Sequence, residues 1–313
     1  MLIFLLFAVV VAFFILRQIR IISLENQALV ASKTENLDIA EKKLTILAFG
    51  DIMLDRNVYL AVKKAGDFNF PFLKIDSLLR GADLRIANLE GPITDFDSVS
   101  IGNTRMRFTI SPQFLEPLKT RFDVLSLANN HILDFGEIGY AQTKEKLGSA
   151  GIGYFGDYKN RKENLAKIIE KNGIKIGWVG YHGLADKNLS EVADEIKTIK
   201  SQSDFVVVFA HWGAEYAQEP SESQKQEARL FIDSGADLII GSHSHVVQSS
   251  EKYQGKKIFY SLGNFIFDQY FSEETMKGLG VEILLRKSNN GIKADYKEYP
   301  LIINKNSQPE LAE

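Results

Sequence analysis

Residues 238–245 read Leu-Ile-Ile-Gly-Ser-His-Ser-His, a short apolar run that leads directly into two histidines. The apolar run, Leu238–Ile240, predicts a buried β-strand. In an extended segment, side chains two positions apart lie on the same face, so His243 and His245 can bind the same ion. A His-x-His pair alone does not establish a metal site, and the pattern along the rest of the chain decides how it is interpreted.

Five other apolar and β-branched runs end in the same way, at a polar residue that can bind a metal or orient a ligand. They are Thr45–Phe49 before Gly50-Asp51, Leu84–Ala87 before Asn88-Leu89-Glu90, Val124–Ala128 before Asn129-Asn130-His131, Phe205–Ala210 before His211, and Ile258–Ser261 before Leu262-Gly263-Asn264. Amphipathic stretches lie between them, including a helix predicted over 220–234 and ended by Gly235. Residues 280–286 and 292–303 predict a hairpin. The alternation predicts an α/β domain, in which sites lie beyond the carboxyl ends of strands.

Histidine is scarce in this chain, with five in total, and four of them stand at the predicted strand ends. Any single buried histidine is more often a structural residue than a metal ligand. Four at equivalent topological positions, together with Asp51, Glu90 and Asn130, instead indicate a shared metal site. The chain has no cysteine, so any metal must be bound by histidine, carboxylate and amide groups.

The composition is that of an ordinary globular protein, with 45% hydrophobic and 25% charged residues in a chain of 313. A chain of this length can bury a large core. The formal net charge of −3 provides no basic footprint, and nucleic acid is therefore not an expected partner.

The N-terminus differs from the rest of the chain. Met1–Leu16 is an unbroken apolar run followed by Arg17 and Arg20. A helix over this run spans about 24 Å, somewhat less than the roughly 30 Å of a bilayer's hydrocarbon core, and the arginines can extend it by reaching to the interface. We predict an uncleaved transmembrane anchor over 1–22, with a secretory signal peptide and a buried core helix as alternatives. The other predicted segments are a linker over 23–43, a folded domain over 44–303 and a tail over 304–313.

Six short motifs occur in an order that resembles one known family. They are FGD at 49–51, NLEG at 88–91, NNH at 129–131 with Asp134 and Gly136, HWG at 211–213 with Glu215-Tyr216, GSHSH at 241–245 and SLGNF at 261–265. Together they resemble the poly-γ-glutamate capsule biosynthesis (CapA) family, which is similar to the calcineurin-like metallophosphoesterases. The resemblance covers about 44–303, and ordered agreement of several motifs is far more specific than any one of them.

The resemblance implies a four-layer αββα sandwich with two divalent metal ions, Mn, Fe or Zn, at the loop edge of its paired sheets. The implied ligands are Asp51 and His245 for the first ion, Asn130, His211 and His243 for the second, and Glu90 as a bridge between the two. His131 is implied to face the substrate as a proton donor or oxyanion stabiliser, oriented by Asp134. Two ions about 3.5–4 Å apart acidify a bridging water and clamp the attacking and leaving oxygens.

One position departs from the metallophosphoesterase pattern. The first motif of those enzymes is Asp-x-His, whereas Met53 stands at the place of that histidine. A thioether is a poor ligand for a hard ion, so we expect Met53 to pack in the core and the first metal site to be weak or empty. This departure weighs against a simple phosphoesterase.

Several polar residues near the motifs have two interpretations each. Arg56 can clamp an anionic substrate, because a guanidinium pairs bidentately with carboxylate or phosphate, or it can form a surface ion pair. Glu215 either supports a metal-bound histidine or is a plain loop carboxylate. The residues for which we predict structural roles are His182, Trp212, Asn264 and Phe265.

The predicted function is that of a metal-dependent hydrolase or transferase in the synthesis or release of an anionic cell-envelope polymer such as poly-γ-glutamate. The alternatives are a non-catalytic membrane-anchored subunit of a polymer synthesis and export complex, which Met53 favours, and a true metallophosphoesterase. Retention of His131 and Asp134 favours catalysis. The expected partners are the polymer, the membrane and synthase or export subunits.

The expected location is the cell membrane, crossed once, with the domain on the extracytoplasmic side as the family resemblance implies. Arg17 and Arg20 follow the apolar run, however, and by the positive-inside rule they favour a cytoplasmic domain instead. An upstream basic leader would reconcile the two.

Overall fold

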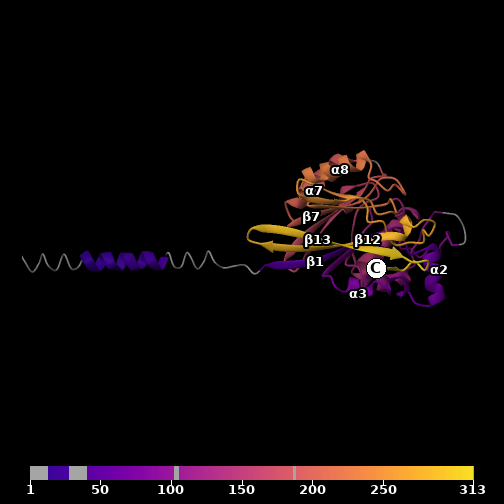
Figure 1. Cartoon of the computed structure of the whole chain (residues 1–313), viewed down its shortest axis with the longest axis horizontal. Helices are drawn as coiled ribbons and strands as arrows, with labels where there is room; N and C mark the ends of the chain where they lie inside the picture. The colour runs from indigo at the N-terminus through magenta and orange to yellow at the C-terminus, as the bar shows by residue number, and fades with distance from the viewer. Residues whose placement is uncertain (1–12, 28–40, 102–105, 186–187, 313) are drawn as a thin grey trace, which may run out of the picture. The chain divides into compact units, whose positions relative to one another are not determined.

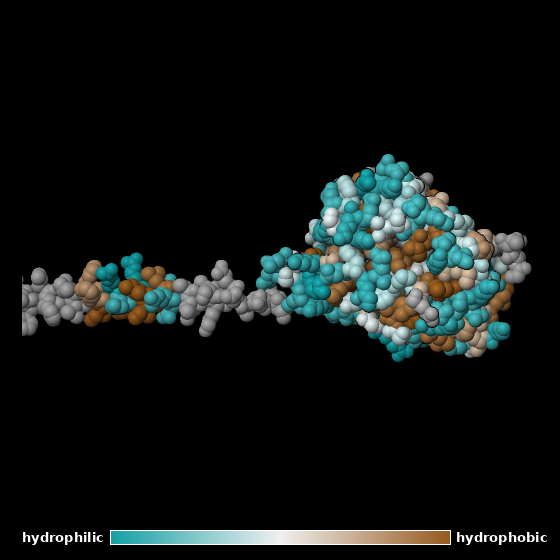
Figure 2. All heavy atoms as spheres, viewed as in Figure 1, coloured by the Kyte–Doolittle hydropathy of each residue, from teal (hydrophilic) through white to brown (hydrophobic). Residues whose placement is uncertain are grey.

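The computed structural model describes residues 13–27, 41–101, 106–185 and 188–312. The chain divides into two units, of which the larger comprises Lys42–Lys287 and Ile292–Glu313 (Figure 1). The smaller contains a helix over residues 13–27, which exposes both hydrophobic and hydrophilic side chains (Figure 2). Among the described residues, no helix is long and apolar enough to cross a membrane. Most of the apolar run that predicts an anchor lies outside them, so the anchor stays a prediction.

The larger unit contains two β-sheets, with strand orders β14-β13-β12-β1-β2-β3-β4, where β11 also pairs with β1, and β5-β6-β7-β8-β10-β9. The first sheet consists of β1 (Lys42–Ile52), β2 (Leu84–Leu89), β3 (Val124–Ser126), β4 (Gly153–Phe155), β11 (Asn264–Ile266), β12 (Lys277–Ser288), β13 (Gly291–Ile303) and β14 (Pro309–Leu311). The second consists of β5 (Ala166–Lys171), β6 (Ile174–His182), β7 (Phe205–His211), β8 (Leu238–Ser242), β9 (Ser250–Tyr253) and β10 (Lys256–Phe259). Strands β1 to β4 are parallel, as are β6, β7, β8 and β10, so their carboxyl ends meet at one edge of each sheet.

Three apolar cores hold the sheets and helices together. Because alternate side chains of a strand point to opposite faces, Ile46 and Ala48 join the core between the two sheets, whereas Leu47 and Phe49 join a core with the helices that cover the first sheet. Those helices are α2 (Arg56–Ala65), α3 (Asp76–Leu79), α4 (Leu115–Lys119) and α5 (Gly136–Ala150). The third core joins the outer face of the second sheet to α6 (Lys162–Leu165), α7 (Leu189–Lys200) and α8 (Glu222–Asp233). Figure 1 shows α7 and α8 on the side of β7. Short 3₁₀ turns span Phe70–Phe72, Pro112–Phe114 and Glu274–Met276.

The predicted α/β fold with two sheets is confirmed, and each of the six predicted runs overlaps a strand. Strand β1 is longer than predicted and includes Asp51 itself. Helix α8 begins after Ser221, which forms a capping box with Gln224, and Gly235 follows its end with a φ of 117°. Strands β12 and β13 form the predicted C-terminal hairpin as neighbours in the first sheet.

Gly50 allows two segments at the edge of the first sheet to approach closely. Strands β1 and β11 pair in parallel with Asp51 opposite Asn264, and a Cβ on Gly50 would lie 1.8 Å from the carbonyl oxygen of Gly263. No side chain larger than hydrogen fits there without moving a backbone.

We expect Gly50→Ala to lower the free energy of unfolding by about 3 kcal/mol, because the backbone of β1 or β11 must shift to admit the methyl group. Urea unfolding followed by circular dichroism measures this change. Gly148→Ala is the matched control: Gly148 lies in α5 with no atom within 4 Å of the added Cβ, so this variant should be neutral or slightly more stable. Equal stabilities of the two variants would contradict the close approach at Gly50.

Candidate metal centre

Polar residues at the carboxyl ends of the parallel strands converge from both sheets. The first sheet contributes Asp51, Glu90, Asn130 and His131, and the second contributes His211, His243 and His245. The two sides meet directly: Nε2 of His211 lies 2.8 Å from Oδ1 of Asn130, and Nδ1 of His245 lies 3.6 Å from Oδ2 of Asp51. The structure therefore brings all six predicted metal ligands together.

Asp51, Glu90 and His245 form one group, whose potential ligand atoms all lie within 4.8 Å of one another. All three side chains are buried. Burial raises the pKa of Asp51 to about 6, although its carboxylate accepts hydrogen bonds from the backbone N–H of His243 (3.1 Å) and the side-chain amide of Asn88 (2.8 Å). This group coincides with the ligand set implied for the first ion and the bridge.

Glu90 lacks a partner for its charge. Its side chain is fully buried, and neither carboxylate oxygen has a hydrogen-bond partner among the described residues. Burial, and then repulsion from Asp51, raise the pKa of Glu90 well above its usual value. An unpaired buried carboxylate is costly, so the residues present fit a cation bound between Glu90 and its neighbours.

Asn130, His211 and His243 form a second group, which coincides with the set implied for the second ion. Nε2 of His211 lies 2.8 Å from Oδ1 of Asn130 and 3.1 Å from Nδ1 of His243. Nδ1 of His211 lies 3.0 Å from the hydroxyl of Ser242 and 3.3 Å from the side-chain amide of Asn88. These contacts orient the ring so that Nε2 faces Asn130 and His243. Burial lowers the pKa of His211 well below its usual value and that of His243 to about 4, so both rings are in the neutral form that binds metals.

His245 is held in one tautomer by Asn264. The amide nitrogen of Asn264 donates to Oε1 of Gln269 (3.1 Å) and to the carbonyl of Thr275 (2.9 Å), so its oxygen must accept the Nδ1 proton of His245, 2.9 Å away. Nε2 of His245 is then unprotonated and lies 3.7 Å from Oε1 of Glu90. Burial also lowers the pKa of His245 to about 3. Asn264 thus prepares His245 as a ligand and has the structural role that we predict for it.

The backbone of the His-x-His segment differs from the prediction. We expect an extended segment, but His243 and His245 have φ angles of 91° and 57° and follow the end of β8 in a bend. Their ring centroids nevertheless lie 6.0 Å apart. A left-handed conformation costs a residue other than glycine about 1–3 kcal/mol and is typical of functional sites. The turn, rather than strand periodicity, brings the two imidazoles together.

His131 and Asp134 form a separate pair beside the two groups. Oδ2 of Asp134 lies 2.7 Å from Nδ1 of His131 and also accepts a hydrogen bond from the backbone N–H of Phe108 (2.6 Å). Since the carboxylate accepts the Nδ1 proton, Nε2 of His131 is the atom that faces the centre, 3.9 Å from Oε1 of Glu90. This geometry agrees with the orienting role implied for Asp134.

Arg56 makes an ion pair within the chain, but not the surface pair of the alternative interpretation, because its partner Asp268 is buried. Its guanidinium contacts both carboxylate oxygens of Asp268, at 3.1 Å and 2.8 Å, and Asp268 also accepts from the backbone N–H of Asn57. The guanidinium lies 5.5 Å from the ring centroid of Phe108, and that ring packs against His131 at 4.2 Å. Arg56 is therefore fixed close to the His131 side of the centre.

Removing the carboxylate in Asp268→Ala should lower the free energy of unfolding by about 3 kcal/mol, because the mostly buried guanidinium of Arg56 and the Asn57 N–H lose their acceptor. Urea unfolding of the full chain measures the loss. In the control, Asp95→Ala, an exposed pair with Lys146 is removed, and the change should be below about 1 kcal/mol. An equally small change in Asp268→Ala would mean that the ion pair does not hold Arg56.

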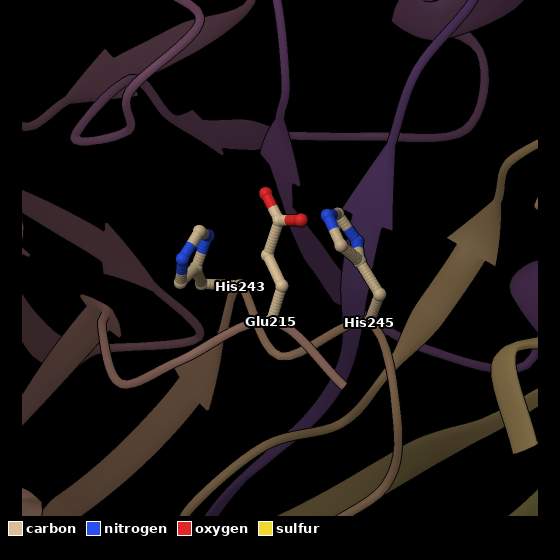
Figure 3. A group of neighbouring side chains, drawn as sticks. All are labelled: Glu215, His243 and His245. Atoms are coloured by element: carbon tan, nitrogen blue, oxygen red, sulfur yellow. The ribbon is translucent and has the colours of Figure 1, made fainter. Parts of the chain in front are cut away.

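Glu215 is an exposed residue that lies beside the centre, although the predicted ligand set does not contain it. Its carboxylate and the imidazoles of His243 and His245 form a group with ligand atoms within 4.8 Å of one another. Figure 3 shows the carboxylate of Glu215 between the two rings. The HWG motif followed by Glu215 is the sequence signal that singles out this residue, but its neighbours in space could not be read from that motif.

Met53 packs as predicted. Its side chain is fully buried in the core that includes the helices of the first sheet, and its sulfur accepts the backbone N–H of Asp55 at 3.1 Å. Trp212 and Phe265 are likewise buried in the cores. His182 is anchored to the carbonyl of Tyr158 through Nδ1 (2.9 Å), while its buried Nε2 has no partner among the described residues.

Comparison with known proteins identifies relatives of this chain. The family model described as "Bacterial capsule synthesis protein PGA_cap" matches residues 45–269. The PGA biosynthesis protein CapA of Bacillus subtilis (strain 168) is 32% identical over 262 residues, which cover 77% of this chain and 68% of that protein. The capsule biosynthesis protein CapA of Bacillus anthracis is 31% identical over 273 residues, which cover 80% and 66%. The chain thus spans about two thirds of the length of these relatives.

A solved structure shares the fold. The crystal structure of a hypothetical protein from Thermus thermophilus matches with a TM-score of 0.51 at 15% sequence identity, over 82% of this chain and 99% of that one. At this identity the likeness extends to the fold alone.

Proposed function

The chain belongs to the bacterial capsule synthesis protein family PGA_cap, and we propose that it is a metal-dependent hydrolase or transferase acting in the synthesis or release of an anionic cell-envelope polymer such as poly-γ-glutamate. The names of the two Bacillus relatives support the substrate class. The packing of two sheets with helices outside is what the resemblance to the metallophosphoesterases implies, and it supports the metal-dependent chemistry.

The observation that carries this proposal is the unpaired carboxylate of Glu90. It is buried, belongs to the group with Asp51 and His245, and lies 3.9 Å from Nε2 of His131. Hydrophobic packing or a structural hydrogen-bond network would not leave both oxygens without a partner. A site for two divalent ions accounts for the whole set.

Asp51 and His245 would hold the first ion, Asn130, His211 and His243 the second, and Glu90 would contact both. Mn, Fe and Zn are all compatible with mixed imidazole, carboxylate and amide ligands. When bound, the ions supply Lewis acidity to the reacting centre.

His131 is the residue placed to move a proton. Asp134 holds its Nδ1 proton, so Nε2 can donate a proton to a leaving group, or stabilise a developing oxyanion, once the ring is charged. His131 is buried, with a relative exposure of 8%. Arg56, whose Nε and Nη2 contact Asp268 near the same side, would present its remaining terminal nitrogen, Nη1, to a carboxylate of the polymer.

The membrane would serve as the place of action. The apolar run at 1–16 would cross the membrane once and the linker would present the domain on its extracytoplasmic side, next to polymer synthase or export subunits. The apolar character of the run supports the anchor, and the extracytoplasmic location of a capsule polymer supports the orientation.

A non-catalytic subunit of a polymer synthesis and export complex is the second candidate. Met53 favours it, because the thioether is buried in the core where metallophosphoesterases have a histidine ligand. In that case the centre would bind metal and the polymer without cleaving the polymer.

An assay on poly-γ-glutamate distinguishes the candidates. The full chain, purified in detergent, is incubated with the polymer and Mn²⁺, and polymer length is followed by size-exclusion chromatography. The proposal predicts shortening or end-group transfer that a chelator abolishes. Unchanged polymer in the presence of bound metal would favour the non-catalytic subunit, and hydrolysis of simple phosphate esters alone would favour a phosphoesterase.

A further inference from the structure

The first metal site is short of one ligand. Asp51, Glu90 and His245 supply three donor groups, and Met53 supplies none because its sulfur packs in the core. The second site has Asn130, His211 and His243 in addition to Glu90. A further carboxylate near His245 would give the first site as many ligands as the second.

Glu215 offers that carboxylate. Its ligand atom lies within 4.8 Å of those of His243 and His245, and Figure 3 shows its carboxylate pointing between the two rings from the loop after β7. His245 belongs both to this group and to the group with Asp51 and Glu90. Nε2 of His245 is unprotonated, as its bond to Asn264 requires, so the imidazole and the carboxylate can bind one cation together.

Hydrogen bonds and close contacts fix the loop that carries Glu215. The backbone N–H of Tyr216 donates to the carbonyl of Ser244 at 2.7 Å, which fixes the loop onto the residue between the two histidines. Tyr216 has a left-handed φ of 64°, and its hydroxyl accepts from Gln269 (3.3 Å). Gly213 begins the turn with a φ of 86°, where a Cβ would lie 2.7 Å from the side chain of Gln224. The position of Glu215 therefore follows from several contacts around it.

We propose that Glu215 is a ligand of the first metal ion and replaces there the imidazole that position 53 does not supply. The inference rests on the proposed function, because it presupposes the dinuclear centre. A carboxylate in place of an imidazole also makes the first site more negative, which favours harder ions such as Mn²⁺ over softer ones.

Manganese titration of the full chain tests this assignment. Bound ions are counted by elemental analysis after dialysis, and free Mn²⁺ is followed by electron paramagnetic resonance. Removing a residue that only supports a metal ligand lowers metal affinity about 10–100-fold. Removing a ligand itself should cost at least as much, so Glu215→Ala should weaken one of the two sites by about 100-fold or more and leave one ion per chain. Glu215→Gln, which keeps the size but not the charge, should weaken the same site.

Glu219→Gln is the matched control, because Glu219 is an exposed carboxylate in the same loop whose Oε2 accepts from Ser249. It should bind both ions as the wild type does. Two ions of unchanged affinity in Glu215→Ala would overturn the assignment and leave the proposed function intact. Loss of both ions would overturn the assignment to the first site. A wild-type chain that binds no Mn²⁺ would defeat both the assignment and the proposed function.

Discussion

Replacement of His131 by alanine should lower the rate of the metal-dependent reaction about 100- to 10,000-fold, the range of a lost general acid or base. Nδ1 of His131 is bound by Asp134, and Nε2 faces the centre without being part of either ligand group. The metal content of the variant should therefore equal that of the wild type. Turnover on the polymer and elemental analysis of the same sample measure both effects.

Asp134→Asn provides the graded comparison for His131. The amide keeps the shape of the side chain but lacks the negative charge of the carboxylate that accepts the Nδ1 proton. We therefore expect a smaller loss of rate than in His131→Ala, and a changed pH profile. Loss of metal in His131→Ala would place that residue among the ligands. An unchanged rate would remove it from the chemistry.

Glu90→Gln should stabilise the metal-free protein at high pH and lose most of the stabilisation that bound metal gives. Folding raises the pKa of Glu90 well above its usual value of 4.5. As the pH rises above 4.5, Glu90 ionises in the unfolded chain but keeps its proton in the folded chain. The stability of the metal-free protein is therefore highest below pH 4.5 and falls as the pH rises. Asp51, with a pKa raised to about 6, acts in the same direction. The metal-free variant should be more stable than the metal-free wild type near pH 8.

With metal present the order is expected to invert. An ion at about 1,000 times its dissociation constant stabilises the native state by about 4 kcal/mol, which raises the Tm of a domain of this size by on the order of 10 °C. Glu90→Gln should lose most of this rise, because it removes the ligand shared by both ions. Thermal scans with chelator and with Mn²⁺ at pH 5 and pH 8 measure the two effects, with Glu222→Gln, an exposed carboxylate on α8, as the control. A variant whose Tm rises with Mn²⁺ as in the wild type would contradict the shared role.

The fold and most of the centre could be predicted because the signal is local. Each strand is a short apolar run that ends in a polar residue, and parallel strands bring such ends to one edge. Asp51, Glu90 and His211 are placed by that rule alone. His243 and His245 are brought together for a different physical reason, a bend with two left-handed residues, which no periodicity indicates.

The remaining features depend on contacts between distant residues. Arg56 and Asp268 are 212 positions apart, and nothing in either local sequence identifies the other as its partner. The place of Glu215 depends on the hydrogen bond from Tyr216 to Ser244 and on the packing of Gly213 against Gln224. A motif marks Glu215 as notable, but only the folded loop shows that its carboxylate lies between two histidines.

The metal content of the full chain, purified with Mn²⁺ and dialysed, tests the central claim most directly. Elemental analysis should find about two ions per wild-type chain, as a dinuclear site requires, and fewer in His243→Ala. Wild-type protein without any bound ion, even after supplementation with Mn, Fe and Zn, would contradict the metal centre and leave Glu90 without an explanation.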